Sequence, residues 1–366
     1  MVTHEFHPQR GGIAVYAAEM ARAATQLGYN VQVWAPSSDK PDPSWPFELR
    51  RLPMMGTHDL PSQWRVAREM FRRRRLLRQA LLYVPEPGPI FALLLLQYFK
   101  STHPGRMVIT LHGSEIRSLA SRPLTRWTAR RLFQRADRLS VANEFARRLL
   151  VENFALAADR IAVAPCALRS DFARTLPPVI ARPAARERMV VLTVARLHPR
   201  KGQHHVIEAL TRVPAELKAR LEYWIVGDCR RPEYKAQLEA QAAQAGFPVR
   251  FHGAVADADL PRYYAEADIF AMTSSPHGHS VEGFGLVYLE AGAHGLPVVA
   301  FATGGVAEAV RDGITGLLVP EQDGAALTAA FVRLLAEPDL RTRLGAGGRE
   351  HAQARTWLDS ARILFD

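Results

Sequence analysis

Short apolar runs that alternate with helical patterns constrain the fold of this chain more than any other feature. This alternation is typical of parallel sheets covered by helices, because a parallel connection needs a crossover, which is usually a helix. The runs that predict buried strands cover residues 31–35, 107–111, 138–142, 161–164, 190–194, 223–226, 249–251, 269–272 and 298–301. The sequence therefore predicts an α/β protein built on parallel sheets.

The chain is long enough for two domains. Its 366 residues exceed the size at which a single core stops growing. The predicted strands fall into two groups on either side of residues 176–188, a stretch rich in Pro and Arg without an apolar period. We predict an N-terminal domain over residues 1–175, a linker, and a C-terminal domain over residues 186–350.

Composition excludes several classes of protein. Cys166 and Cys229 are the only cysteines, so neither a disulfide framework nor a cysteine-built zinc site is expected. The longest apolar run, near residues 90–96, falls short of the roughly 20 residues that span a bilayer. No signal sequence opens the chain, and we expect a cytoplasmic protein.

Positive charge is concentrated in the first half. The formal net charge is +11, and residues 1–175 hold 26 Lys and Arg against 14 Asp and Glu. Such a surface attracts anions, including the cytoplasmic face of a membrane. Nucleic acid is not expected as a partner, because no recognition motif or aromatic platform accompanies the arginines.

A helix is predicted over residues 64–82. Its arginines at spacings of three and four form a cationic stripe, and most of its apolar residues lie elsewhere on the helix. The stripe consists of Arg65, Arg68, Arg72 and Arg75, and the apolar residues are Val66, Met70, Phe71, Leu77 and Leu81. This pattern fits a helix at an anionic membrane surface and equally a solvated helix that packs its apolar side on the core.

Two segments of the first half sit where ligands bind in parallel α/β proteins. Gly11 and Gly12 precede a predicted helix over residues 13–27, where the backbone can approach a ligand or form a plain turn. His112 and Gly113 follow the strand at 107–111, at its carboxyl end.

Two further segments lie in the second half. Arg196 and Lys201 follow the strand at 190–194 and could clamp a diphosphate. Glu282-Gly283-Phe284-Gly285 opens a predicted helix over residues 286–294, whose free amides and dipole favour an anion. Glu290 lies eight residues after Glu282, and a carboxylate suits paired sugar hydroxyls because it accepts two hydrogen bonds.

Together these residues resemble a known family. The arrangement Glu282-Gly-Phe-Gly-Leu-Val-Tyr-Leu-Glu290, followed by Gly295-Leu-Pro-Val-Val and Thr303-Gly304-Gly305, with Arg196 and Lys201 upstream, resembles the family 4 retaining glycosyltransferases. The resemblance implies the GT-B fold, with two Rossmann-like domains whose parallel sheets face a central cleft. The N-terminal domain would bind the acceptor, the C-terminal domain the nucleotide-sugar donor, and a helix over residues 352–366 would cross back to the first domain.

The resemblance also implies residue roles. Arg196 and Lys201 would bind the donor diphosphate, Glu282 the hydroxyls of the transferred sugar, and His112 would contact that sugar near the reacting centre. The expected catalytic residues are Glu282, His112, Arg196 and Lys201. The expected donor-binding residues are Gly11, Gly12, Arg196, Lys201, Gly227, Gly253, Val255, Gly283, Phe284, Gly285, Leu286 and Glu290, with Glu290 on the nucleotide ribose.

The implied activity is sugar transfer from a nucleotide-diphosphate donor to a hydroxyl acceptor with retention of configuration. Arg196, Lys201 and the helix near Gly285 would stabilise the leaving diphosphate, so we expect neither a metal ion nor another cofactor. The cationic first half favours a glycan or lipid-linked acceptor at the inner face of the cell membrane. The alternatives are a soluble acceptor, a nucleotide-sugar isomerase of the same fold, or a non-catalytic nucleotide-sugar binder.

Overall fold

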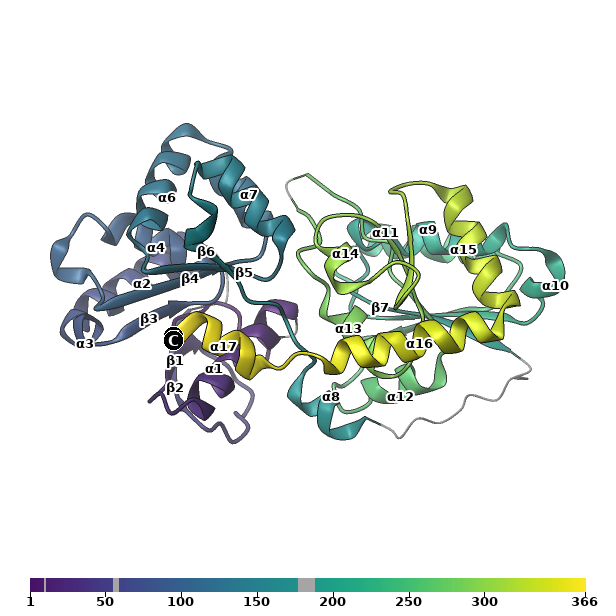
Figure 1. Ribbon diagram of the computed structural model, residues 1–366, viewed down its shortest axis with the longest axis horizontal. Helices are drawn as coiled ribbons and strands as arrows, with labels where there is room; N and C mark the ends of the chain where they lie inside the picture. Colours follow the sequence, from purple (N-terminus) through teal and green to yellow (C-terminus); the bar gives the residue numbers. More distant parts are fainter. Residues whose placement is uncertain (10, 55–58, 177–187, 279) are drawn as a thin grey trace. The chain divides into compact units, whose positions relative to one another are not determined.

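The protein consists of two compact units (Figure 1), each described here by itself. The structure is a computed structural model that describes residues 1–9, 11–54, 59–176, 188–278 and 280–366. The first unit comprises Met1–Cys166 together with Thr356–Asp366, and the second comprises Ala167–Arg355. The predicted boundary at 175 is therefore too late. Residues 167–175 group with the second unit because the ring of Phe172 packs against Tyr264 and His294.

A six-stranded parallel sheet forms the centre of the second unit. Its strands follow the order β12-β11-β10-β7-β8-β9. Their bounds are β7 Met189–Val194, β8 Leu221–Val226, β9 Val249–Gly253, β10 Ile269–Ala271, β11 Val298–Phe301 and β12 Gly316–Val319. The strand order reverses between β7 and β10, so the crossovers after these two strands leave in opposite directions. Such a reversal opens a crevice at the carboxyl ends of the strands.

Helices cover both faces of this sheet (Figure 1). One layer contains α9 (Gln203–Thr211), α11 (Pro232–Ala243) and α15 (Gly324–Ala336), and the other contains α12 (Leu260–Glu266), α13 (Leu286–Ala293) and α16 (Pro338–Gln353). The short elements are α8 (Ser170–Thr175), η3 (Pro199–Lys201), α10 (Ala215–Lys218) and α14 (Val306–Ala309). Helices α13 and α16 approach closely, since a Cβ on Gly292 would lie 2.8 Å from the carbonyl oxygen of Gly348.

The first unit contains two groups of parallel strands that the opening residues join. One group is β1 (Gln32–Pro36) with β2 (Glu48–Leu52), and the other is β3 (Leu81–Val84), β4 (Arg106–Leu111), β5 (Arg138–Val141) and β6 (Ile161–Val163), in that order. The Val2 amide donates to the Tyr83 carbonyl, and the Thr3 amide donates to that of Trp34. The backbone around Val2 therefore lies between β1 and β3 and connects the two groups.

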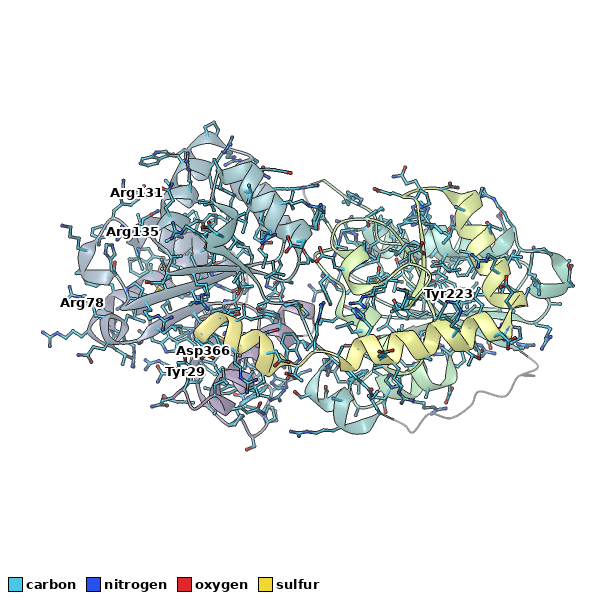
Figure 2. The ribbon with its side chains drawn as sticks, in the orientation of Figure 1. Tyr29, Arg78, Arg131, Arg135, Tyr223 and Asp366 are labelled. Atoms are coloured by element: carbon cyan, nitrogen blue, oxygen red, sulfur yellow. The ribbon has the colours of Figure 1, made fainter. Side chains whose placement is uncertain are left out.

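Helices also cover both faces in the first unit. On one face α1 (Gly12–Gln26) packs against α17 (Trp357–Phe365), while α2 (Leu60–Arg72), α4 (Gly88–Leu96) and α6 (Pro123–Arg135) lie side by side elsewhere. The remaining elements are α3 (Arg74–Gln79), η1 (Lys100–Thr102), α5 (Ser114–Ala120), α7 (Glu144–Phe154) and η2 (Ala158–Arg160). Tyr29 donates a hydrogen bond to the Phe365 carbonyl, next to the labelled Asp366 in Figure 2.

Each predicted strand corresponds to an observed one, with ends that differ by at most two residues. The sequence pattern missed β2, β3 and β12. The helix predicted over residues 64–82 is confirmed as two helices, α2 up to Arg72 and α3 over Arg74–Gln79, and it is wrong at its end, where Leu81 and Leu82 belong to β3. Strand β3 pairs with β4 along its whole length, and this tertiary pairing overrides the helical spacing. The predicted linker lies almost wholly outside the described residues.

Helix α17 gives a test of this architecture. Trp357 is buried, and its ring centroid lies 5.5 Å from that of Tyr16 on α1, whereas Ile363 on the same helix is 38% exposed. We expect Trp357→Ala to lower the free energy of unfolding by about 3–5 kcal/mol, because the substitution leaves a cavity. Ile363→Ala should cost less than about 1.5 kcal/mol in the same urea titration. Equal costs would contradict this packing of α17.

Candidate active site

The candidate site of the second unit lies where β7, β10 and β11 end. Arg196 and Lys201 follow β7, Ser274 follows β10, and Thr303 follows β11. The hydroxyl of Thr303 donates to the Ser274 carbonyl at 2.8 Å, which ties two of these loops together. All three loops leave the same edge of the sheet, at the reversal of strand order.

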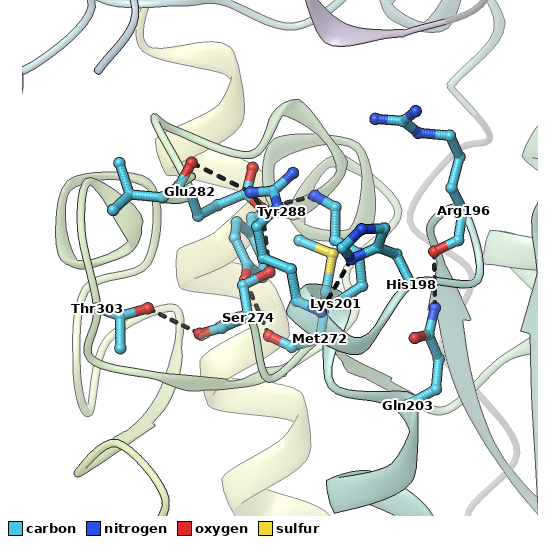
Figure 3. Close-up of polar contacts among 11 residues, drawn as sticks. Arg196, His198, Lys201, Gln203, Met272, Ser274, Glu282, Tyr288 and Thr303 are labelled. Atoms are coloured by element: carbon cyan, nitrogen blue, oxygen red, sulfur yellow. Dashed lines mark hydrogen bonds and ion pairs between the residues drawn. The ribbon is translucent and has the colours of Figure 1, made fainter. Parts of the chain in front are cut away.

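Glu282 is the centre of this cluster (Figure 3). Its Oε2 atom accepts hydrogen bonds from Lys201 Nζ at 2.5 Å, Ser274 Oγ at 3.0 Å and Arg200 Nη1 at 3.2 Å. Oε1 accepts none of these bonds. A substrate hydroxyl that reaches Oε1 would therefore leave the ion pairs intact.

Glu282 and Lys201 stabilise each other's charges. Burial opposes the charge of the Glu282 carboxylate, but Lys201 and Arg200 outweigh it and hold its pKa below the ordinary value. Burial lowers the pKa of Lys201, with Arg200 and Arg196 adding to this effect and Glu282 opposing it. The Glu282 carboxylate therefore stays ionised, and Lys201 and Arg200 form a cationic region beside it.

Two glycines allow the loops to meet. A Cβ on Gly202 would lie 2.1 Å from the Thr273 carbonyl oxygen, and φ at Gly202 is +73°. A Cβ on Gly304 would lie 2.4 Å from the carbonyl oxygen of Glu282, and the Gly305 amide donates to that same oxygen. Side chains at these positions would push apart the loops that carry Lys201 and Glu282.

Arg196 differs from Lys201 in its surroundings. Its side chain is exposed and makes no ion pair within the described ranges, while its carbonyl accepts from Gln203 at 3.0 Å (Figure 3). Arg196 is thus free to bind an anion.

His198 lies in the same turn. Its Nδ1 accepts a hydrogen bond from the Arg200 amide at 3.1 Å. Burial and the surrounding arginines lower the pKa of His198 to about 4, so its ring is neutral at pH 7.

The predicted Gly-Phe-Gly turn leads into α13. Gly285 is the N-terminal cap residue with φ +84°, and a Cβ there would lie 2.5 Å from the Tyr288 ring. Phe284 is buried, whereas Gly283, Gly285 and Leu286 are partly exposed. The turn therefore anchors through Phe284 and leaves the helix N-terminus open to an anion.

Glu290 has a different environment from Glu282. It is buried, and its Oε2 accepts from the Tyr264 hydroxyl at 2.8 Å. Burial raises its pKa, although the positive charge of Arg169 and the bond from Tyr264 oppose this effect. Arg169 is itself paired with Asp171 and Asp257. The predicted contact of Glu290 with a ribose remains a prediction.

Three of the residues predicted to bind the donor, Gly227, Gly253 and Val255, lie at or just after the carboxyl ends of β8 and β9. The Gly227 amide donates to the Gly253 carbonyl at 2.8 Å, and a Cβ on Gly227 would lie 1.9 Å from the Ala195 carbonyl oxygen. Gly253 is exposed with φ +67°, and Val255 is partly exposed. The backbone of this segment is accessible to a flat ring, and the His252 ring beside it packs on Trp224 and Tyr263.

In the first unit, His112 lies at the carboxyl end of β4. Its Nε2 lies 2.7 Å from the Pro85 carbonyl oxygen and donates a hydrogen bond to it. Its ring contacts the edge of Tyr16, with centroids 5.0 Å apart. Gly11 caps α1, and both Gly11 and Gly12 are exposed.

The residues that the sequence pattern missed contribute to the same cluster. Arg200 and Ser274 donate hydrogen bonds to Glu282, and Tyr264 donates one to Glu290. Arg200 is adjacent to Lys201 in the turn η3, which is the one local signal for it. The chain also contains an Asp-x-Asp triplet at residues 257–259, but the carboxylate of Asp257 is paired with Arg169.

Two family models match the chain. "Glycosyltransferase Family 4" covers residues 10–172, and "Glycosyl transferases group 1" covers residues 181–351. A GDP-mannose-dependent alpha-(1-6)-phosphatidylinositol monomannoside mannosyltransferase of Mycolicibacterium smegmatis is 31% identical over 96% of this chain and 93% of its own length.

The chain belongs to the family 4 glycosyltransferases. A GDP-mannose-dependent monoacylated alpha-(1-6)-phosphatidylinositol monomannoside mannosyltransferase of Corynebacterium glutamicum is 28% identical to the chain. The match covers 97% of the chain and 93% of the length of that relative. A D-inositol 3-phosphate glycosyltransferase of Geodermatophilus obscurus is 38% identical over 61% of the chain and 50% of its own length.

Solved structures show the same GT-B fold. Sucrose-phosphate synthase from Thermosynechococcus elongatus has a TM-score of 0.76 at 22% identity and covers 99% of the glycosyltransferase and 95% of its own chain. HepE of Anabaena, solved in complex with UDP and glucose, has a TM-score of 0.74 at 19% identity. The match covers 99% of the chain described here and 96% of the HepE chain. The protein is a GT-B enzyme with glycosyltransferase activity, as the sequence predicted.

Removal of the central carboxylate tests the cluster. We expect Glu282→Gln to abolish most transfer activity and to lower the free energy of unfolding by about 3–5 kcal/mol, because it leaves Lys201 buried without its counter-charge. Glu239→Gln is the matched control, since its ion pair with Lys235 is exposed and should cost less than about 1 kcal/mol. Urea unfolding that gives equal costs would show that Glu282 is not a structural centre.

The raised pKa of Glu290 predicts a pH-dependent stability difference. A buried acid with a raised pKa contributes its full stability below its unfolded pKa and loses it as pH rises through the folded pKa. Glu290→Gln cannot ionise, so its stability relative to the wild type should increase between pH 4 and pH 8, as measured by thermal unfolding. A difference that stays constant or shrinks over this range would contradict the assignment.

Proposed function

We propose that this glycosyltransferase moves mannose from GDP-mannose to an inositol-phospholipid glycoside, with retention of configuration and without a metal ion. The single observation that carries the donor site is the contact of Lys201 and Arg200 with Glu282, beside the open N-terminus of α13. Lys201 and Arg200 provide cations for a diphosphate, and Glu282 provides a carboxylate that can accept hydrogen bonds from sugar hydroxyls. The relatives aligned over nearly the whole chain support the choice of donor and acceptor.

The chemistry follows from the charges. The bond between the sugar C1 and the β-phosphate oxygen breaks, and negative charge develops on the departing GDP. Lys201, Arg196 and the amides of Gly285 and Leu286 would stabilise this charge, an effect worth several kcal/mol of barrier. The acceptor hydroxyl forms the new bond to C1 on the same face, and its proton passes to the leaving phosphate. This route uses no protein nucleophile.

His112 and the glycines of the first unit complete the proposal. His112 is held by the Pro85 carbonyl, so its ring orientation is fixed before any sugar binds. Gly11 and Gly12 at the start of α1 would face the phosphate and the acceptor. Glu290 would accept a hydrogen bond from the ribose, with its carboxyl already oriented by Tyr264.

We also propose that the enzyme acts at the cytoplasmic face of the cell membrane, with Arg65, Arg68, Arg72 and Arg75 against anionic lipid headgroups. These four arginines are exposed, and no helix of the described ranges is long and apolar enough to cross a bilayer. A soluble inositol phosphate is the alternative acceptor, favoured by the relatives that match over about 60% of the chain.

Ligand binding tests the donor. We expect GDP and GDP-mannose to raise the melting temperature more than UDP or ADP compounds, with about 2.7 kcal/mol of stabilisation at a hundredfold excess over Kd. Lys201→Gln should lose most of this stabilisation, whereas Lys235→Gln, on the exposed face of α11, should keep it. Stabilisation by UDP alone would overturn the choice of GDP.

Product analysis tests the acceptor. Incubation with GDP-mannose should add one mannose to a phosphatidylinositol monomannoside in vesicles, at a rate unchanged by EDTA. Proton NMR of the product should show an α-anomeric linkage, as retention requires. Transfer to D-inositol 3-phosphate but not to the lipid would establish the soluble alternative.

A further inference from the structure

The helices α2, α4 and α6 expose an unusual set of large apolar side chains. Six of them are Trp64 and Phe71 on α2, Phe91 and Leu95 on α4, and Leu124 and Trp127 on α6. We call this set the three-helix face. The helices pack against one another, since α2 contacts α4, α4 contacts α6, and Gln97 donates to the Thr128 carbonyl. Large exposed apolar side chains gathered on helices that lie side by side are typical of an interaction site.

One of these side chains, Phe71, departs from the pattern predicted from the sequence. That pattern places Phe71 with the apolar residues of a helix, away from the arginine stripe. In the structure Val66 and Met70 fill the core, while Phe71 lies on the exposed side with Arg68 and Arg72. The outer side of α2 is therefore both aromatic and cationic.

Cations are interleaved with these rings. Arg68 lies over the Trp64 ring at 5.8 Å, Arg74 over Phe71 at 4.7 Å, and Arg131 over Tyr98 at 5.4 Å. Figure 2 labels Arg131 and Arg135 at the outer side of α6. Aromatic rings next to arginines are the composition of helices that lie at a bilayer interface.

Negative charge is scarce around this surface. Residues 60–135 hold 15 Lys and Arg against 3 Asp and Glu. Of the three acids, Glu69 is paired with Arg50 and Arg73, Glu86 is buried, and Glu115 accepts the backbone amides of His112 and Gly113. The outward charge is therefore positive and complementary to an anionic partner.

We infer that the three-helix face inserts its apolar side chains into an anionic lipid bilayer, in addition to the electrostatic contact of the arginine stripe. This inference rests on the proposed lipid acceptor and specifies how the enzyme reaches it. A second copy docked on the same surface would bring two cationic faces together, which repel. Insertion of Trp and Leu adds a binding contribution that salt does not screen, because it depends on apolar area.

Vesicle sedimentation separates the two contributions. The wild type should bind vesicles of phosphatidylcholine with phosphatidylglycerol at low salt, and part of this binding should persist at about 1 M salt, where the Debye length is about 3 Å. Leu124→Ser with Trp127→Ser should weaken the salt-resistant part at least tenfold. Arg126→Gln with Arg130→Gln should weaken binding at low salt and leave the salt-resistant part in place.

Ile314→Ser is the matched control, because Ile314 in the second unit is 55% exposed, the same fraction as Trp127. It should leave vesicle binding unchanged. Vesicles should also shield the tryptophan fluorescence of the wild type from iodide, and Trp127→Phe should reduce this shielding. Unchanged binding of the Leu124→Ser, Trp127→Ser variant, or an equal loss in Ile314→Ser, would overturn the inference.

Other partners give distinct results. Binding to a single-stranded oligonucleotide without binding to vesicles, or concentration-dependent dimers that Leu124→Ser with Trp127→Ser dissociates, would also overturn it. Release of GDP from GDP-mannose in vesicle-free solution keeps the two proposals separate. If the wild type releases GDP but does not bind vesicles, only the inference of membrane insertion is refuted. If it binds vesicles but does not release GDP, only the proposed function is refuted.

Discussion

The ion pair between Lys201 and Glu282 is the interaction on which the candidate site depends. Through its side chain Glu282 holds the loops after β7 and β10, and through its carbonyl it holds the loop after β11. A buried charge pair is stable only when its hydrogen bonds are satisfied, and here three donors share one carboxylate oxygen. The enzyme thus maintains a charged cluster before any substrate arrives, which is the preorganisation that electrostatic catalysis requires.

The two glutamates of the motif have opposite environments, although only eight residues separate Glu282 in the loop before α13 from Glu290 within that helix. Lys201, Arg200 and Ser274 keep Glu282 ionised, whereas burial raises the pKa of Glu290 although Arg169 and the hydrogen bond from Tyr264 oppose this. Glu290 therefore costs stability at neutral pH, a cost consistent with a residue retained for binding rather than for folding. The three-helix face has a similar character, because exposed Trp and Leu side chains do not stabilise the unit that carries them.

Much of the fold could be predicted because buried parallel strands are short, continuous apolar runs. Strand β3 escaped this signal, since Leu81 and Leu82 continue the helical spacing of the preceding arginines and only the pairing with β4 separates them. Strand β2, with the sequence Glu-Leu-Arg-Arg-Leu, carries too little apolar character to be identified locally. Among the site residues, Lys201 and Glu282 were predicted as neighbours by resemblance, and the comparison of sequences confirmed the family. Ser274 and Tyr264 gave no distinct local signal, because their partners Glu282 and Glu290 lie on other segments of the chain.

The sequence by itself determined the fold class, the family and the residues that bring charge to the site, because strand periodicity and motif spacing are local properties. The tertiary structure alone decided which of these charges meet, that Glu282 is paired while Arg196 makes no ion pair within the described ranges, and that Phe71 and Trp127 are exposed. The physical reason is that ion pairing and exposure depend on neighbours from distant segments. Helical spacing fixes which residues share a face of α2, but only the packing of α4 beside it decides which face remains in contact with solvent.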